Sequence, residues 1–447
     1  MKTNSNPGKK SHHKESIISS KLSGKWLNKL AKECGFVKRK AQKLIPKSMI
    51  IGFMLMASKA RNTYSDWATE IGLLTGQCIS KQALCERLLD PSAEKYIKKV
   101  LEGTIDKQIV YKPSQKASGT LKHFNNIYID DSTTISLPDE LSNEFPGSVT
   151  KGKKKAQAKI HALFNLTCNS FAFLNIHSFA NNDQSLSSNV LPYLQKGDLI
   201  LRDLGFTTLN VLGAFIEKAI FFISRKLYSI NLYEPETGAL IDLLRLLRKK
   251  KFLDKQVIVG KEHQIKLRLI AVRVPAQKAE SRIRKAKKDR DKRLNHSPEY
   301  YALLRYNIFL TNIPESICNT DQIYQIYRWR WQIEIIFKSW KSYFSLEKLI
   351  HWQCRNATRV KCTIYLMLLY IIMFHVVWWY ECNSKISNSQ INEQVSLLKL
   401  ANFFRNHFYE IVTSSNKVIL AQIIAHCKYE NRQDRENARL SYSKFAA

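Results

Sequence analysis

Residues 327–341, with the sequence YRWRWQIEIIFKSWK, form the most informative segment of the chain. The surrounding residues 321–344 contain neither glycine nor proline, so we expect one helix of about six turns. At about 100° per residue, four polar side chains fall within an arc of about 60° of this otherwise apolar helix. These four are Tyr327, Arg330, Glu334 and Lys341.

This polar stripe has two explanations. It is either the face of an ordinary amphipathic helix, with Glu334 paired to Arg330 and Lys338, or a functional signature. The order Tyr, two residues, Arg, three residues, Glu, six residues, Lys resembles the signature of a class of bacterial insertion-sequence transposases. Members of that Tyr-Arg-Glu-Lys class have an Asp-Asp-Glu active site on a ribonuclease H-like core, and many move by hairpin-type cut-and-paste.

Two upstream aspartates occur where this resemblance requires them. Residues 127–134 are predicted to be a buried strand running into a polar turn, and residues 198–206 a second apolar strand that ends at Asp203. Between them, residues 160–166 and 171–179 form two strand-like runs, and 185–195 a short helix. A helix (207–219) and a strand (220–227) follow. This order is typical of a ribonuclease H-like mixed sheet.

The first carboxylate is either Asp130 or Asp131. We choose Asp131 because Ser132 and Thr133 follow it, as in the resembled class. It also lies two residues after Ile129, so that both side chains would point to the same face of the strand. The resemblance implies that Asp131, Asp203 and Glu334 are catalytic and hold two Mg²⁺ ions, with Mn²⁺ as a substitute. Carboxylates suit this role because magnesium prefers oxygen ligands.

The resemblance also implies DNA contacts for the other signature residues, Tyr327, Arg330 and Lys341. Arginine presents a fork of donors to phosphate and lysine a point charge. One feature departs from the class: hairpin-forming relatives stack a flipped base on an aromatic ring of the insertion, often Trp, and no Trp occurs between Trp67 and Trp329. The available rings are Tyr228, Tyr233, Phe252, Tyr300 and Tyr301.

Residues 228–307 are predicted to be a mostly β insertion with a basic arm. Residues 256–274 alternate in the manner of strands, and residues 282–293 are rich in Lys and Arg. The arm is either a clamp on the DNA backbone or a solvated charged helix, and we favour the clamp. Its predicted DNA-contacting residues are Arg282, Arg284 and Lys285.

The flanking regions are predicted to be α-helical. Residues 1–115 are basic, as expected of a region that binds the element's ends in the resembled class. Residues 80–88 form either the recognition helix of a helix-turn-helix, with Ser80 as N-cap and Lys81 and Arg87 on DNA, or an ordinary capped helix. The remaining predicted segments are 116–227 and 308–380 for the core, and 381–447 for a helical, dimer-forming tail.

The composition agrees with a nucleic-acid partner. With 71 Lys and Arg against 37 Asp and Glu, the formal net charge is +34, which favours binding to polyanions. The nine cysteines include no Cys-x-x-Cys pair, which argues against a zinc finger. The N-terminal residues contain no apolar signal, and the uncharged segment 363–380 suits a buried helix better than a membrane span.

Together with these features, the resemblance implies a cytoplasmic, nucleoid-associated bacterial transposase. By analogy with the resembled class, it would act as a homodimer on double-stranded DNA, both terminal inverted repeats and target, without a membrane partner. The alternative is a catalytically inactive, transposase-derived protein that only binds DNA.

Overall fold

The computed structural model describes residues 22–38, 44–109, 119–150, 152–248, 250–288, 296–348, 350, 355–375, 395–413 and 416–429. These residues fall into two compact units. A helical unit combines the N-terminal region up to Thr104 with Ser339–Glu430, and a mixed α/β unit includes Ile105–Lys338. The carboxyl-terminal helices therefore belong with the amino-terminal helices.

The mixed α/β unit is built on a ten-stranded sheet with the order β2-β3-β1-β5-β6-β10-β9-β8-β7, in which β4 also pairs with β3. The strands are β1 (Ile127–Leu137), β2 (Pro146–Thr150), β3 (Lys153–Asn165), β4 (Ser170–Ser178), β5 (Leu199–Arg202), β6 (Phe221–Arg225), β7 (Leu232–Tyr233), β8 (Phe252–Val259), β9 (Ile265–Arg273) and β10 (Tyr306–Thr311).

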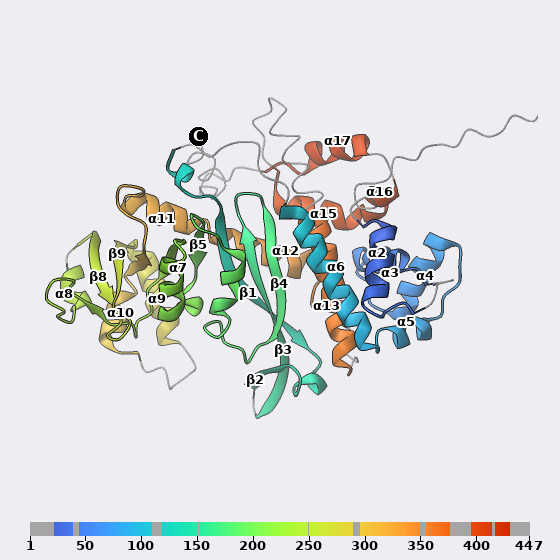
Figure 1. Cartoon of the computed structure of the whole chain (residues 1–447), viewed down its shortest axis with the longest axis horizontal. Coiled ribbons are helices and arrows are strands. Elements are labelled where there is room, and N and C mark those ends of the chain that lie inside the picture. Colours follow the sequence, from blue (N-terminus) through green and yellow to red (C-terminus); the bar gives the residue numbers. More distant parts are fainter. Residues whose placement is uncertain are drawn as a thin grey trace, which may run out of the picture. The chain divides into compact units, whose positions relative to one another are not determined.

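Strand β1 lies between two kinds of neighbour. On one side it is antiparallel to β3, and on the other it is parallel to β5, which is in turn parallel to β6. The antiparallel strands β1, β3 and β4 run through the green centre of Figure 1. Strand β5 is buried along its whole length, as is usual for parallel strands covered on both faces.

The predicted order of strands and helices between residues 127 and 227 is confirmed. The short helix between β4 and β5 is a 3₁₀ helix, η3 (Ser187–Tyr193), and α7 (Leu209–Glu217) connects β5 to β6. The structure adds one strand that the sequence pattern did not indicate, β2. It pairs with the lysine-rich beginning of β3, a segment too polar to show an apolar alternation.

The predicted insertion is rich in strands, but they do not form a separate sheet. Strand β10 pairs antiparallel with both β6 and β9, so β7, β8 and β9 extend the central sheet. One apolar core includes Ile200 of β5, Leu267 of β9 and Leu310 of β10. The helices of this segment are α8 (Leu243–Leu247), α9 (Ala276–Lys287) and α10 (Pro298–Leu303).

The prediction of one six-turn helix is wrong, because the structure has two shorter helices in this segment. These are α11 (Thr320–Arg328) and α12 (Trp331–Ser342). At the break, the backbone N–H of Arg330 donates to the carbonyl of Tyr327, and that of Ile333 to the carbonyl of Arg330, three residues back in each case. This tight 3₁₀-type turn needs no glycine or proline, which is why the sequence does not reveal it.

The helical unit contains α2 (Gly24–Glu33), α3 (Pro46–Ser58), α4 (Tyr64–Thr75), α5 (Lys81–Arg87), most of α6 (Pro91–Ile109), α13 (Ala357–Met373), α15 (Leu397–Asn406), α16 (Phe408–Thr413) and α17 (Asn416–His426) (Figure 1). Its core is formed by α3 and α13, which are apolar nearly all round and almost fully buried. Where α3 meets α4, a Cβ on Gly52 would lie 2.6 Å from Ile71 Cγ1.

The uncharged segment 363–380 lies in α13 as far as Met373, and residues 376–380 fall outside the described residues. The interpretation as a buried helix agrees with α13, where every side chain from Ile364 to Met373 is buried. Within the described part of the chain, none of the helices has the length and apolarity needed to cross a membrane.

Candidate active site

Strands β1 and β5 deliver the two predicted aspartates side by side. The parallel pairing of these strands ends at the pair Asp130 and Arg202, so the next residues along the chain are Asp131, still within β1, and Asp203, directly after β5. Asp131 Oδ1 accepts a hydrogen bond from the backbone N–H of Ser132 at 2.8 Å. Asp203 is the N-cap residue of the short 3₁₀ helix η4 (Leu204–Phe206). The sheet thus brings the two carboxylates side by side, with Asp131 within β1 and Asp203 directly after the end of β5.

The tight turn between α11 and α12 directs Arg330 at two of the three predicted catalytic carboxylates. Its Nη1 lies 2.8 Å from Asp131 Oδ2, and its Nη2 lies 2.8 Å from Glu334 Oε1. The guanidinium is well buried, with 13% of its side chain exposed. One cation therefore joins Asp131 of β1 to Glu334 of α12, although the two residues are far apart in the sequence.

Tyr327 connects the third carboxylate to the same turn. Its hydroxyl donates to the carbonyl of Arg202 at 3.2 Å and to Asp203 Oδ1 at 3.4 Å. Burial raises the pKa of Tyr327, so the hydroxyl keeps its proton at neutral pH. Tyr327, Arg330 and Glu334 thus all lie beside Asp131 and Asp203, in one site.

Asp130 faces away from this site. It is fully buried, with Oδ1 2.6 Å from His161 Nε2 and Oδ2 2.7 Å from Arg202 Nη2. Successive side chains of a strand point to opposite faces, so only one of the two adjacent aspartates can face the site. The geometry favours Asp131, which is the residue that Arg330 contacts.

The site holds an unusual balance of charge. Burial raises the pKa of Asp131 to about 7, while Arg330 and the Ser132 N–H limit the rise and Asp203 adds to it. Burial lowers the pKa of Arg330, but Tyr327, Asp203, Asp131 and Glu334 together raise it above its ordinary value. The guanidinium is therefore permanently charged, and it neutralises carboxylates that would otherwise repel each other.

The carboxylate oxygens of the site are the type of ligand that a hard divalent cation prefers. Among the described residues, however, no group of three or more His, Cys, Asp or Glu side chains is gathered closely enough to hold a metal ion. The guanidinium of Arg330 lies between Asp131 and Glu334 and acts as the cation there. Asp131 and Glu334 each lie 2.8 Å from a different nitrogen of this one cation, and carboxylate oxygens are the ligands that a divalent ion such as Mg²⁺ prefers.

Residues 122–372 match the family described as the transposase DDE domain. The match covers more than half of the chain and includes all three carboxylates. The chain belongs to the DDE transposase family. Its match begins just before β1 and ends within α13, so it also spans the strands of the insertion.

Several insertion-sequence transposases are similar to this DDE family member over most of their length. The transposase of IS231B from Bacillus thuringiensis subsp. berliner is 29% identical over 79% of this chain and 77% of its own. That of IS1151 from Clostridium perfringens is 24% identical over 86% of this chain and 85% of its own. Among solved structures, a piggyBac transposase synaptic complex with hairpin DNA covers 94% of this chain and 84% of its own at 10% identity, with a TM-score of 0.43.

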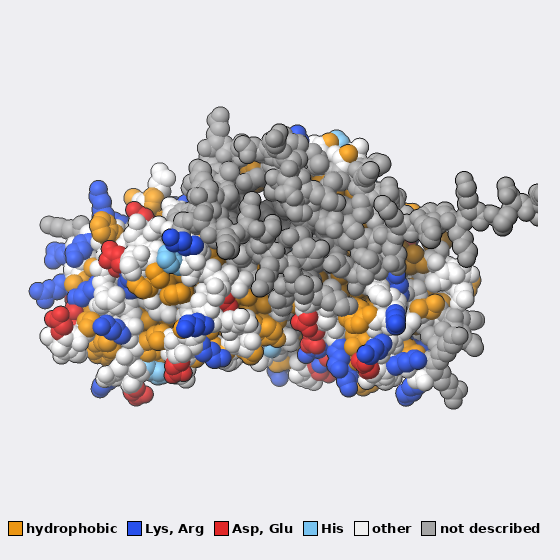
Figure 2. Space-filling model, turned by 45° about the horizontal axis from the view of Figure 1, so that its top comes forward, with side chains coloured by type: hydrophobic (Ala, Val, Ile, Leu, Met, Phe, Trp, Pro, Cys, Tyr) orange, Lys and Arg blue, Asp and Glu red, His pale blue; other side chains and the backbone are white. Residues whose placement is uncertain are grey.

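The predicted DNA-contacting residues differ in their availability. Lys341 is exposed two turns beyond Glu334 on α12 and makes a long ion pair, 3.9 Å, with Glu347. Arg284 and Lys285 are exposed on α9, and Lys81 is exposed at the start of α5. On the face drawn in Figure 2, Lys and Arg side chains are spread over the described surface rather than gathered in one patch.

Besides Tyr327 and Arg330, two further predicted DNA contacts are already engaged within the protein. Arg282 Nη2 donates to Asn307 Oδ1 at 2.7 Å, and Arg87 Nη1 donates to the carbonyl of Phe36 at 3.0 Å. The predicted N-cap of α5 is confirmed, because Ser80 Oγ accepts from the N–H of Ala83 at 3.1 Å. The outer part of the basic arm, residues 289–293, lies outside the described residues.

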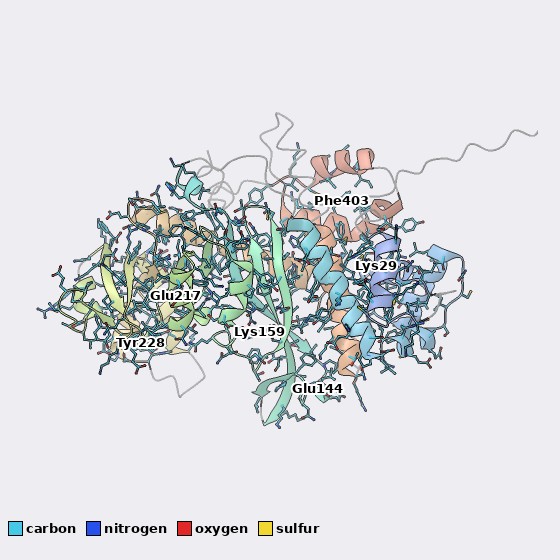
Figure 3. The ribbon with its side chains drawn as sticks, viewed as in Figure 1. Lys29, Glu144, Lys159, Glu217, Tyr228 and Phe403 are labelled. Carbon is cyan, nitrogen blue, oxygen red and sulfur yellow. The ribbon has the colours of Figure 1, made fainter. Side chains whose placement is uncertain are left out.

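The aromatic rings predicted for the insertion include two exposed ones. Tyr228, labelled in Figure 3, is 49% exposed, and Phe252 is 64% exposed. Tyr228 meets Tyr300 edge to face with ring centroids 5.4 Å apart, and Tyr300 in turn stacks on His296 at 4.1 Å. The pair Tyr228 and Phe252 thus offers accessible ring surface on this part of the sheet.

Sequence reasoning missed a polar chain beside Asp131. Lys159 of β3, labelled in Figure 3, lies with Nζ 2.8 Å from Asp183 Oδ1, and Ser132 Oγ donates to the same oxygen at 3.1 Å. Asp183 also packs so closely on Gly205 that a Cβ there would lie 2.8 Å from Oδ2. Asp183 stands in a polar loop with no strand or helix period, so no local signal could have identified it.

Proposed function

We propose that the protein is the transposase of an insertion sequence. It binds the terminal inverted repeats of its element and catalyses divalent-metal-dependent DNA strand cleavage and strand transfer. Asp131, Asp203 and Glu334 form the catalytic triad. The observation that carries this proposal is the convergence of Asp131 and Glu334 on Arg330, with Asp203 joined to the same turn through Tyr327.

The core is proposed to be ribonuclease H-like. Supporting this, β4, β3 and β1 form an antiparallel meander and β5 and β6 continue it in parallel, with α7 as the crossover. In such an arrangement the two aspartates lie side by side on adjacent central strands. The third carboxylate then has to come from a helix packed beside them, the position of Glu334 on α12.

Mg²⁺ is the proposed cofactor, as two ions, and Mn²⁺ is its substitute. When bound, two such ions would activate the attacking oxygen and stabilise the leaving oxygen of the phosphodiester. The three carboxylates supply the oxygen ligands that Mg²⁺ prefers. The hydroxyl of Tyr327 supports this end of the site, because it contacts both the Asp203 carboxylate and the carbonyl of Arg202.

The signature is proposed to be of the Tyr-Arg-Glu-Lys class, with Tyr327, Arg330 and Lys341 contacting DNA phosphates. Arg330 has two alternative anionic partners in this scheme, the carboxylates of the site and a phosphate. A phosphate suits the guanidinium because it accepts two parallel hydrogen bonds. Moving to the phosphate would also free Asp131 and Glu334.

Further DNA contacts are proposed for the exposed cations Lys81, Arg284 and Lys285. Arg87 and Arg282 would need to exchange their internal partners in order to join them. We propose that residues 1–115 recognise the element's ends, that residues 228–307 contact DNA alongside the core, and that residues 381–447 contribute to a homodimer. Two ends must be cut together, which favours a dimer in the synaptic complex.

A hairpin intermediate is part of the proposal. The support from this chain is the pair of exposed rings, Tyr228 and Phe252, since any aromatic ring can stack on a flipped base. The alternative function, an inactive DNA-binding protein derived from a transposase, is less well supported because all three carboxylates and Lys341 are present.

The test uses purified protein with a labelled duplex that contains the element's own terminal repeat, with and without magnesium. We expect magnesium-dependent nicking at the repeat boundary by the wild type. Glu334→Gln should bind the duplex without nicking it. Glu217→Gln, which changes an exposed carboxylate on α7, is the matched control and should cut normally. Binding without any cleavage by the wild type would support the inactive binder instead.

A further inference from the structure

A buried arginine lies directly behind the candidate active site. Arg202, the last residue of β5, is fully buried, and its guanidinium lies 5.5 Å from the ring centroid of Phe206 and 5.4 Å from that of Phe215. Arginine is rarely buried unless it is paired, because removing its charge from water is costly. Its partners therefore indicate what the residue does.

The side chain of Arg202 joins β5 to β1. Its Nε lies 2.9 Å and its Nη2 2.7 Å from Oδ2 of Asp130, which is also fully buried. Nη2 in addition donates to the carbonyl of Ser187 at 2.8 Å. The second oxygen of Asp130 accepts from Nε2 of His161, on β3, at 2.6 Å. Three adjacent strands are thus connected through three buried side chains, one from each strand.

The backbone of Arg202 joins β5 to the signature helices. Its carbonyl accepts a hydrogen bond from the hydroxyl of Tyr327 on α11 at 3.2 Å. Arg202 is also the immediate neighbour of Asp203, and Asp130 is the immediate neighbour of Asp131. Arg202 is therefore joined directly to β1 and is the last residue of β5. Its connection to Glu334 runs through Tyr327 and Arg330.

The position of this ion pair in the sheet is informative. Asp130 and Arg202 are partners at the last paired position of β1 and β5, one residue before both carboxylates. A slip of one residue between two strands turns the side chains of one strand to the opposite face. An ion pair at this position favours the register that places Asp131 and Asp203 next to each other.

We propose that Arg202 and Asp130 are positioning residues that set the separation of the Asp131, Asp203 and Glu334 carboxylates. The pair acts from behind the sheet, through its neighbours, and touches neither substrate nor metal. Because a buried ion pair is often no more stabilising than an apolar pair of similar volume, stability alone does not account for it. This proposal rests on the proposed function, since it concerns the geometry of the same site.

The test replaces the ion pair by an apolar pair, Asp130→Leu with Arg202→Met. The matched control is Asp198→Asn, which removes a buried carboxylate at the opposite ends of the same two strands, where Asp198 accepts from Asn126 at 2.9 Å. Each protein is bound to a pre-cleaved terminal duplex with a dideoxy 3′ end, so that nothing can be cut or joined. Mn²⁺ affinity and the electron paramagnetic resonance signal of paired Mn²⁺ ions are measured, together with the urea midpoint of unfolding.

We expect the double variant to fold and to bind the duplex, but to bind Mn²⁺ about 10- to 100-fold more weakly and to lose the signal of paired ions. The control should retain both. Wild-type Mn²⁺ affinity and spectrum in the double variant would overturn the proposal. Failure of the wild type itself to bind Mn²⁺ would instead overturn the proposed function.

A second variant keeps the test decisive if the double variant does not fold. Arg202→Lys retains the positive charge but lacks the fork that reaches Asp130 and Ser187 together. It should weaken Mn²⁺ binding about tenfold while leaving the unfolding midpoint nearly unchanged. If Arg202→Lys binds paired Mn²⁺ ions as tightly as the wild type, the positioning role is excluded.

Discussion

The guanidinium of Arg330 lies against the carboxylate of Asp131, with Nη1 2.8 Å from Oδ2. The same guanidinium holds Glu334 through Nη2. Two of the three proposed metal ligands are therefore already neutralised by a side chain that is itself proposed to bind phosphate. If Arg330 exchanges carboxylates for phosphate, metal binding and DNA binding must assist each other.

Replacing Arg330 by Gln should separate these two events. Without DNA, we expect Arg330→Gln to bind Mn²⁺ more tightly than the wild type at pH 8, because no cation competes for Asp131 and Glu334. DNA should strengthen Mn²⁺ binding in the wild type by a factor of about 5 to 150, and by little in the variant. Titration calorimetry with and without terminal duplex measures both, and Arg328→Gln is the neighbouring control. An equal effect of DNA in both proteins would contradict the exchange.

Asp131→Asn should stabilise the metal-free protein at high pH. Burial raises the pKa of Asp131 from 3.8 to about 7, so between these values the folded state binds more protons than the unfolded state. Stability contributed by protonated Asp131 is complete below pH 4 and lost as the pH rises through 7. A pKa shift is worth about 1.4 kcal/mol per pH unit. The free energy of unfolding of Asp131→Asn should therefore exceed that of the wild type by up to about 4 kcal/mol at pH 8 and by little at pH 4.

Urea unfolding in a chelating buffer at the two pH values measures this difference. A variant that is less stable than the wild type at pH 8 would show that the carboxylate is not strained by its surroundings.

Lys341→Ala should weaken the positioning of the strand end and leave metal affinity unchanged. Lys341 is exposed on α12, two turns from Glu334, where it would meet a phosphate rather than a metal ion. Losing one phosphate contact should reduce the salt dependence of duplex binding by about one in the log–log slope. Lys338→Ala, one turn earlier and also exposed, is the control. A large loss of Mn²⁺ affinity in Lys341→Ala would refute the assignment.

Gly52→Ala should destabilise the helical unit by about 1–3 kcal/mol. A Cβ at this position would lie 2.6 Å from Ile71 Cγ1 and 3.3 Å from the backbone nitrogen of Ile71, so α3 and α4 would have to separate. Gly72→Ala is the matched control on α4, because its Cβ would meet only the carbonyl of Gln77 at 3.6 Å. Chemical unfolding followed by circular dichroism compares them, and equal midpoints would mean that the helices adjust without cost.

Local patterns in the sequence were sufficient to predict the order of elements in the core and the residues of the signature. The apolar runs that become β1, β5 and β6 are visible because buried parallel strands need them. The spacing from Tyr327 to Lys341 is visible because a helical period places such residues on one face. Both signals depend only on residues close together along the chain.

Only the tertiary structure decided what these residues meet. It turned Arg330 toward Asp131 through a break in the predicted helix, buried Asp130 against Arg202, and joined the strands of the insertion to the core through β10. It also gave Arg282 and Arg87 partners inside the protein. These outcomes depend on contacts between residues far apart in the sequence, where burial and charge pairing determine the geometry. The local periodicity of the sequence carries no information about such contacts.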